Sequence, residues 1–173
     1  MQPAVIGACL TLAGSGGWGW LLARQLQRRP AELAAIQAAL GVLRTEIEYR
    51  RTPLPTALTR AARGGPAAVR CLLESTAMVL GQGGGVTPGE AWSSALTRAD
   101  RISAWTTEDL VLLSRLGDAL GASGPEDQVR HIEACSRQLR LAEGRARSGL
   151  ERRARMWLYL GVLVGAALVL VTI

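Results

Sequence analysis

The residues of this chain that could carry out chemistry are few and poorly arranged for catalysis. His131 is the one histidine, and Asp127 precedes it by four residues on the same predicted helix, with no nucleophile elbow near to complete a Ser-His-Asp triad. Glu46 and Glu48 could form a carboxylate pair, but two residues apart on a helix they point to different faces. That spacing is typical of solvated helix surface. We therefore expect a protein that is not an enzyme.

Lysine and cysteine usage excludes further chemistry. All 20 positively charged residues are arginines, so neither a phosphate-binding loop ending in Gly-Lys-Ser/Thr nor a Schiff base can form. The glycine cluster at 81–85 is therefore interpreted as a flexible loop. Cys9, Cys71 and Cys135 include no Cys-x-x-Cys pair, which indicates free thiols in a reducing compartment. One histidine is too few for a typical zinc site, and we expect no cofactor.

An apolar stretch lies at each end of the chain, at 3–23 and at 156–173. At about 1.5 Å per residue, a helix over either stretch comes close to the ~30 Å hydrocarbon thickness of a bilayer. We therefore predict transmembrane helices at 1–23 and 156–173, with one domain at 24–155 between them. In the second stretch, Gly161 and Gly165 form a small-xxx-small spacing at which another membrane helix could pack closely.

Arginines flank each apolar stretch only on the side that faces the middle of the chain. They are Arg24, Arg28, Arg29, Arg145, Arg147, Arg152, Arg153 and Arg155. The positive-inside rule therefore places the central domain in the cytoplasm and both termini outside, in a protein of the cell membrane with two spans. The first stretch has no positive charge before its apolar core, which favours a retained anchor over a cleaved signal peptide. Its many glycines leave an interfacial segment as the alternative.

The formal net charge of +6 belongs to these flanks. Once the eight flanking arginines are set aside, the remaining 12 arginines face 14 acidic residues, so the central domain is not basic in itself. A basic surface for nucleic acid is therefore not expected, and the charge indicates a membrane surface instead.

Apolar residues at spacings of three and four predict helices throughout the domain, and no alternating run long enough for a strand occurs. The first predicted helix has Pro30 in its first turn and ends near Tyr49. The others run from Pro53 through Ala61, from Pro66 to Gly81, from Pro88 through Leu96, from Thr106 to about Leu120, and from beyond Pro125 into the second apolar stretch. Thr52 is a predicted cap, and Thr87 and Thr106 open capping boxes with Glu90 and Asp109. The fold class is all-α, a bundle of about six helices.

The sixth predicted helix contains no proline between residues 128 and 173. We therefore expect it to run nearly straight into the second apolar stretch, which would couple the domain to the membrane. A break at Gly144 or Gly149 is the alternative.

Two blocks of residues are more specific than any single motif. The first comprises Arg29-Pro30, Leu40, Leu43, Glu46-Ile47, Tyr49 and Thr52-Pro53-Leu54, and the second comprises Gly117, Leu120-Gly121, Gln128 and His131-Ile132, with Trp92 in the predicted fourth helix. Together with the two terminal apolar stretches, they resemble the stage III sporulation protein AB family of endospore-forming bacteria. The resemblance covers nearly the whole chain. It departs from the family pattern at Gly124, where an aspartate is common.

This resemblance implies a structural component of the secretion-like channel that links mother cell and forespore during sporulation. Family members are similar to the cytoplasmic domains of inner-membrane platform proteins in type II secretion and type IV pilus systems. By that analogy the domain would dock a cytoplasmic secretion-type ATPase and sibling sporulation membrane proteins on the mother-cell side. The alternative is a membrane subunit that oligomerises with copies of itself to line a conduit and docks no ATPase.

The candidate docking residues lie where the first predicted helix ends. They are Glu46, Tyr49, Arg50, Arg51 and Thr52. The alternative is that Tyr49 and Thr52-Pro53 only fix the turn between the first two helices.

Overall fold

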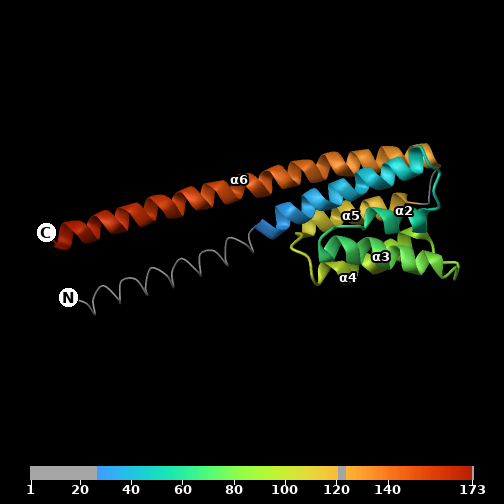
Figure 1. Cartoon of the computed structure of the whole chain (residues 1–173), viewed down its shortest axis with the longest axis horizontal. Coiled ribbons are helices and arrows are strands. Elements are labelled where there is room, and N and C mark those ends of the chain that lie inside the picture. Colours follow the sequence, from blue (N-terminus) through green and yellow to red (C-terminus); the bar gives the residue numbers. More distant parts are fainter. Residues whose placement is uncertain (1–26, 121–123, 173) are drawn as a thin grey trace. The chain divides into compact units, whose positions relative to one another are not determined.

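The computed structural model describes residues 27–120 and 124–172, with side chains up to residue 149 except that of residue 125. These residues form six helices and no strand, which confirms the all-α class (Figure 1). The helices are the first helix over residues 27–48, α2 (Leu54–Ala61), α3 (Ala67–Gly81), α4 (Pro88–Asp100), α5 (Thr107–Ala119) and α6 (Pro125–Thr172).

The chain divides into two compact units. Residues 29–146 form one unit, which contains the helical bundle, and residues 1–28 with 147–173 form the other. Within the described part of the chain, no helix is both long and apolar enough to cross a bilayer. The predicted span at 1–23 lies outside the described residues, and the one at 156–173 falls where no side chains are described.

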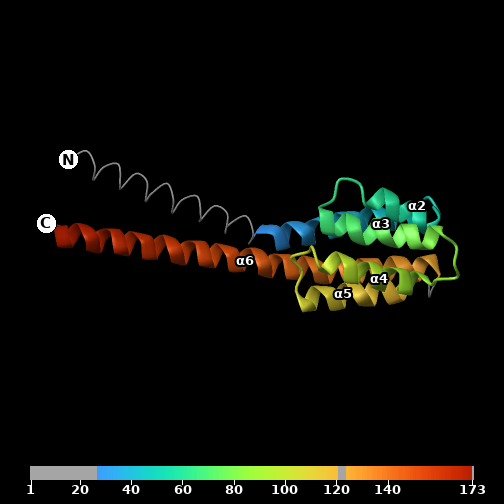
Figure 2. The ribbon, with the colours of Figure 1, turned by 90° about the horizontal axis from the view of Figure 1, so that it is seen from below.

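Two layers of helices make up the bundle, with the first helix, α2 and α3 in one and α4, α5 and the start of α6 in the other (Figure 2). Large apolar side chains from every helix fill the space between the layers, as the three- and four-residue spacings predicted. The largest fully buried ones include Leu33, Ile36, Leu40, Leu43, Leu58, Leu72, Leu73, Trp92, Leu113, Ile132 and Leu139.

The first helix and α6 run antiparallel. The Gln37 amide nitrogen donates a hydrogen bond to Glu143 at 2.8 Å, and the Arg44 guanidinium lies 3.0 Å from Glu133. The residue further along the first helix thus contacts the residue that comes earlier in α6. The points where the chain enters and leaves the bundle therefore share one end, and residues 49–53 lie at the other end (Figure 1).

Two of the three predicted caps are confirmed. The Glu90 amide donates a hydrogen bond to the Thr87 hydroxyl at 3.3 Å, and the Thr87 amide donates one to the Glu90 carboxylate at 2.9 Å. The box of Thr106 and Asp109 also forms. The prediction for Thr52 is wrong, because Pro53 occupies the N-cap of α2 and makes no side-chain cap.

The helix ends differ from prediction in one further place. The chain is already helical at residue 27, the first residue that the structure describes, so Pro30, which was predicted in the first turn, lies at least three residues into the first helix. A proline near a helix start removes one backbone hydrogen bond without ending the helix. The backbone of α6 is helical at Gly144 and Gly149, whereas the predicted coupling of this helix to the membrane stays a prediction.

The packing of α4 against α5 depends on a tryptophan and a glycine. Trp92 is fully buried, and its indole N–H donates a hydrogen bond to the Leu113 carbonyl oxygen at 2.8 Å. A Cβ atom at Gly117 would lie 2.2 Å from the indole Cδ1 atom of Trp92. The two helices approach this closely because residue 117 has no side chain.

Candidate partner-docking site

The candidate site is built on the turn between the first helix and α2. The Tyr49 amide donates to the Thr45 carbonyl oxygen, and the Thr52 amide donates to the Glu46 carbonyl oxygen, each at 3.1 Å. Between them Arg51 has a φ of 47°, a left-handed conformation that residues other than glycine seldom adopt. This turn reverses the chain direction and presents its tip at the end of the bundle.

A buried carboxylate holds the turn together. Glu46 is only 6% exposed, and it accepts hydrogen bonds at 2.7 Å from the Thr52 hydroxyl and from the Arg60 guanidinium. Arg50 adds an ion pair at 3.5 Å. The hydrogen bond from Thr52, supported by the two arginines against the opposing effect of burial, lowers the pKa of Glu46.

The expectation that Glu46 and Glu48 both lie on solvated surface is wrong for Glu46. Its carboxylate faces Arg60, which comes from α2 and lies 14 residues further along the chain. Glu48 is exposed as expected and pairs with Arg44 at 3.0 Å. The two carboxylates point in different directions, in agreement with their spacing.

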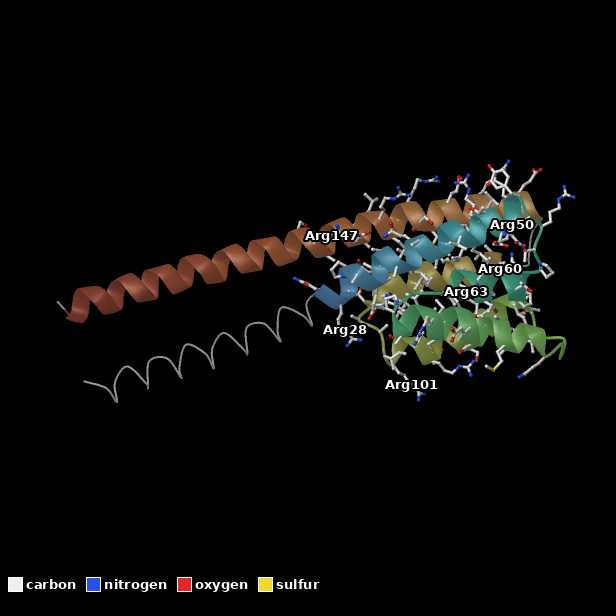
Figure 3. All side chains as sticks on the ribbon, viewed as in Figure 1. Arg28, Arg50, Arg60, Arg63, Arg101 and Arg147 are labelled. Atoms are coloured by element: carbon white, nitrogen blue, oxygen red, sulfur yellow. The ribbon has the colours of Figure 1, made fainter. Side chains whose placement is uncertain are left out.

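The five candidate docking residues divide into two groups. Glu46 and Thr52 face each other inside the turn and act on its shape. Tyr49 is 74% exposed, the Arg50 side chain is 64% exposed, and Arg51 is exposed as well. Figure 3 shows Arg50 at the end of the bundle. Three adjacent exposed side chains, one aromatic and two cationic, are therefore available to a partner.

A groove of about 1030 Å³ adjoins the turn. Its walls come from the end of the first helix, from Arg51 and Thr52 in the turn, and from the start of α6. Gly124 and Asp127 both line it, so Asp127 supplies a carboxylate beside Gly124. The groove is not evident from the sequence, because it joins segments that are about 75 residues apart in the sequence.

The remaining reactive residues do not converge. His131 is exposed on α6, and the Asp127 side chain is 55% exposed and lies 3.5 Å from Arg130. Cys71 and Cys135 are free thiols, and burial raises the pKa of Cys135 to about 11. Among the described residues, no group of three histidine, cysteine or acidic side chains could hold a metal ion.

Two other sets of predicted residues have no described surroundings. Cys9 lies outside the described residues. Gly161 and Gly165 belong to the helical backbone of α6, in the part where no side chains are described, so their proposed role in membrane-helix packing stays a prediction.

Substitutions in the turn should distinguish the residues that stabilise its conformation from those that are only exposed on its surface. Thr52→Val removes the hydroxyl donor to Glu46 and should lower the free energy of unfolding by about 1 kcal/mol. Tyr49→Ala removes an exposed ring and should change it by less than about 0.5 kcal/mol. Urea unfolding of residues 24–155, followed by circular dichroism, measures both. Equal effects of the two substitutions would contradict this division of the site.

Comparison with known proteins gives a consistent result. The sequence profile of the stage III sporulation protein AB family matches residues 4–173. Stage III sporulation protein AB of Bacillus subtilis strain 168 is 26% identical over 166 residues, which cover 96% of each chain. A solved structure of a stage III sporulation protein AB (SpoIIIAB) superposes with a TM-score of 0.67 at 26% identity, covering 72% of this chain and 97% of the other.

Proposed function

The chain belongs to the stage III sporulation protein AB family, a family of sporulation proteins, and we propose that it is a non-catalytic docking component of the channel complex between mother cell and forespore. Its proposed partners are sibling sporulation membrane proteins and a cytoplasmic secretion-type ATPase. The bundle faces the mother-cell cytoplasm in this proposal, and the terminal segments anchor it in the cell membrane.

The membrane anchor is supported by the apolar stretches at 1–23 and 156–173 and by their one-sided arginine flanks. The backbone of α6 is helical through residues 156–172, and a helix is one of the two structures that can satisfy the backbone inside a bilayer. Gly161 and Gly165 are the proposed contact points for a neighbouring membrane helix.

The exposed turn is the observation on which the docking role rests. Within the bundle, the first helix begins at the end opposite to the turn over residues 49–53 (Figure 1). The first helix spans roughly 30 Å between residue 29 and the turn, at about 1.5 Å per residue. The turn is therefore far from the point where the chain enters the bundle.

The hydrogen bonds of Glu46 make the turn rigid, which also favours a role in partner binding. The buried Glu46 carboxylate fixes the backbone on both sides of the exposed residues, so little conformational entropy is lost when a partner binds. Aromatic and arginine side chains are the types most enriched among the residues that dominate binding energy at protein interfaces. The two arginines favour an acidic patch on the partner.

The docking role is tested by affinity recovery of the tagged, full-length protein from sporulating cells after crosslinking. We expect the secretion-type ATPase and sibling membrane proteins to be recovered, and Arg50→Glu with Arg51→Glu to reduce their yield by roughly tenfold or more, as for charges at the centre of an interface. A matched control reverses Arg70 and Arg98, which are exposed on α3 and α4.

Two further measurements make the result decisive. The helical melting curve should be unchanged in the reversed variant, and Arg51→Glu alone leaves the ion pair of Arg50 with Glu46 intact. Recovery of only copies of this chain would favour the self-oligomerising conduit subunit and count against docking. If the folded Arg50→Glu, Arg51→Glu variant still recovers the ATPase in full yield, the ATPase does not dock at this turn.

A further inference from the structure

A second groove lies on the side of the bundle, between α5 and α6. We call it the α5–α6 groove. Its volume is about 450 Å³, and its lining includes Val111, Leu112 and Arg115 from α5 and Leu141, Ala142 and Arg145 from α6. It shares no lining residue with the groove beside the turn, which reaches only residues 126–130 of α6.

Four apolar side chains line the α5–α6 groove, beside polar and charged ones. Leu141 is 63% exposed and Val111 is 45% exposed, although large apolar side chains elsewhere in the bundle are mostly buried. Leu112 is half-buried, and Ala142 is buried beside Leu141. A single exposed leucine on a protein surface is ordinary. Two exposed apolar side chains on facing walls of one hollow are better explained by a partner that covers them.

The groove lies between two antiparallel helices. The Cys135 thiol lies 3.9 Å from the Leu112 carbonyl oxygen, whereas Arg145 lines the groove together with Thr107 near the start of α5. The two helices are therefore antiparallel, and their side chains form two long walls. An amphipathic helix can place residues at i, i+3, i+4 and i+7 along such a groove.

Glu108 and Asp109 also line the groove, but Asp109 is buried and pairs with Arg29, so the charges that remain around the groove are mainly positive. Arg137 and Arg140 lie on the adjoining surface of α6, in a second hollow that shares Leu141 with the groove. The carboxylate in that hollow, Glu133, already pairs with Arg44 at 3.0 Å and with Arg137 at 3.9 Å. Within the described part of the chain, Arg115 and Arg140 make no ion pair. A partner with carboxylates at the edges of its apolar face would neutralise this excess charge.

We propose that the α5–α6 groove binds an amphipathic helical segment of a partner protein whose polar edges carry aspartate or glutamate. Apolar side chains of this segment lie between Val111 and Leu141, and its carboxylates pair with Arg115, Arg137 and Arg140. A membrane surface fits these observations less well, because a flat layer of lipid headgroups cannot cover the floor of a hollow between two helices. This binding site is separate from the turn and does not depend on the proposed function.

Photocrosslinking from within the groove tests the proposal on the full-length protein in sporulating cells. The photoreactive residue p-benzoylphenylalanine replaces Leu141, and mass spectrometry identifies the attached peptide. We expect a peptide from another protein, with apolar residues at helical spacing and net negative charge. The control carries the same probe at Met78, which is 64% exposed on α3, away from any groove described above.

Charge reversal then tests the electrostatic part. Arg137→Glu with Arg140→Glu should lower the adduct yield by roughly tenfold, because two attractive pairs become repulsive. Reversal of Arg70 and Arg98 should leave the yield unchanged, and circular dichroism should show that both variants are folded. The proposal is overturned by an adduct to lipid, to a second copy of this chain or to a basic or neutral segment, by a yield no higher than at Met78, or by a yield insensitive to the reversal.

Discussion

Gly117→Ala should destabilise the bundle, although alanine is the better helix former. The added methyl group would lie 2.2 Å from the indole Cδ1 atom and 2.7 Å from the Cγ atom of Trp92, which is fully buried. Neither atom belongs to the flexible end of a side chain, so α4 and α5 must move apart. Overpacking of this kind costs about 1–3 kcal/mol. Urea unfolding of residues 24–155 should show the loss as a lower midpoint.

A double-mutant cycle identifies the indole as the cause. Trp92→Ala alone should cost about 3–5 kcal/mol, the range for removing a large buried aromatic side chain. In that background Gly117→Ala should no longer destabilise, because the clashing ring is absent and alanine is favoured over glycine within a helix by about 1 kcal/mol. If alanine at residue 117 costs the same with and without the ring, the close contact does not determine the packing of α4 on α5.

Gly41 provides the matched control. It lies within the first helix, and a Cβ atom there would have no other atom within 4 Å. Gly41→Ala should therefore raise the free energy of unfolding by about 0.5–1 kcal/mol through helix propensity alone. Suppose that alanine lowers the free energy of unfolding at Gly117 and raises it at Gly41. The contact with Trp92, and not the backbone freedom of glycine, then distinguishes the two positions.

The fold was largely predictable from the sequence because the signals that specify it are local. The spacing of Leu33, Ile36 and Leu40 depends only on the helical period, and all three are fully buried. The capping box of Thr87 and Glu90 needs only residues three apart. Local rules failed at Thr52, because α2 begins one residue later than a Thr52 cap requires and Pro53 occupies its N-cap. The Thr52 hydroxyl donates a hydrogen bond to Glu46 within the turn.

The candidate site was predictable only in part, because its geometry depends on residues distant in the sequence. The sequence placed Glu46 and Tyr49 together near the helix end but could not show that one is buried and the other exposed. That difference follows from Arg60, which lies on another helix. The α5–α6 groove was missed for the same reason. Val111 and Leu141 have unremarkable positions in the helical period, and their exposure follows from how α5 packs on α6.

One further buried carboxylate joins distant parts of the bundle. The Asp109 side chain is inaccessible to solvent, and Arg29 donates two hydrogen bonds to it, at 2.9 and 3.1 Å, across 80 residues of sequence. Asp109 also accepts the Thr106 amide at 2.9 Å. The pair attaches the start of the first helix to the start of α5, at the end where the chain enters the bundle.

Arg29→Met should therefore be strongly destabilising at neutral pH. It keeps most of the apolar stem of the side chain and leaves a buried, ionised Asp109 without its counter-charge. Breaking a fully buried pair costs about 3–5 kcal/mol, and because the Arg29 side chain is 27% exposed we expect about 2–3 kcal/mol. Arg44→Met removes the more exposed pairs with Glu48 and Glu133 and should change stability little. Urea unfolding at pH 7 compares the two.

The pH dependence of this loss distinguishes a missing charge partner from missing packing. In the wild type, burial alone would raise the pKa of Asp109, but the hydrogen bonds from Arg29 and Thr106 outweigh it, and the pKa is lowered. Ionised Asp109 therefore stabilises the fold above the ordinary aspartate pKa of about 3.9, and this stabilisation is lost as the pH falls through the lowered value. In Arg29→Met the hydrogen bonds from Arg29 no longer offset the effect of burial, so the pKa of Asp109 rises. The folded protein then takes up a proton at Asp109 at a higher pH than the wild type does. The difference between wild type and Arg29→Met should thus be largest at pH 7 and shrink toward about pH 4. A difference that stays constant across this range would mean that Arg29 contributes through its stem and not through its charge.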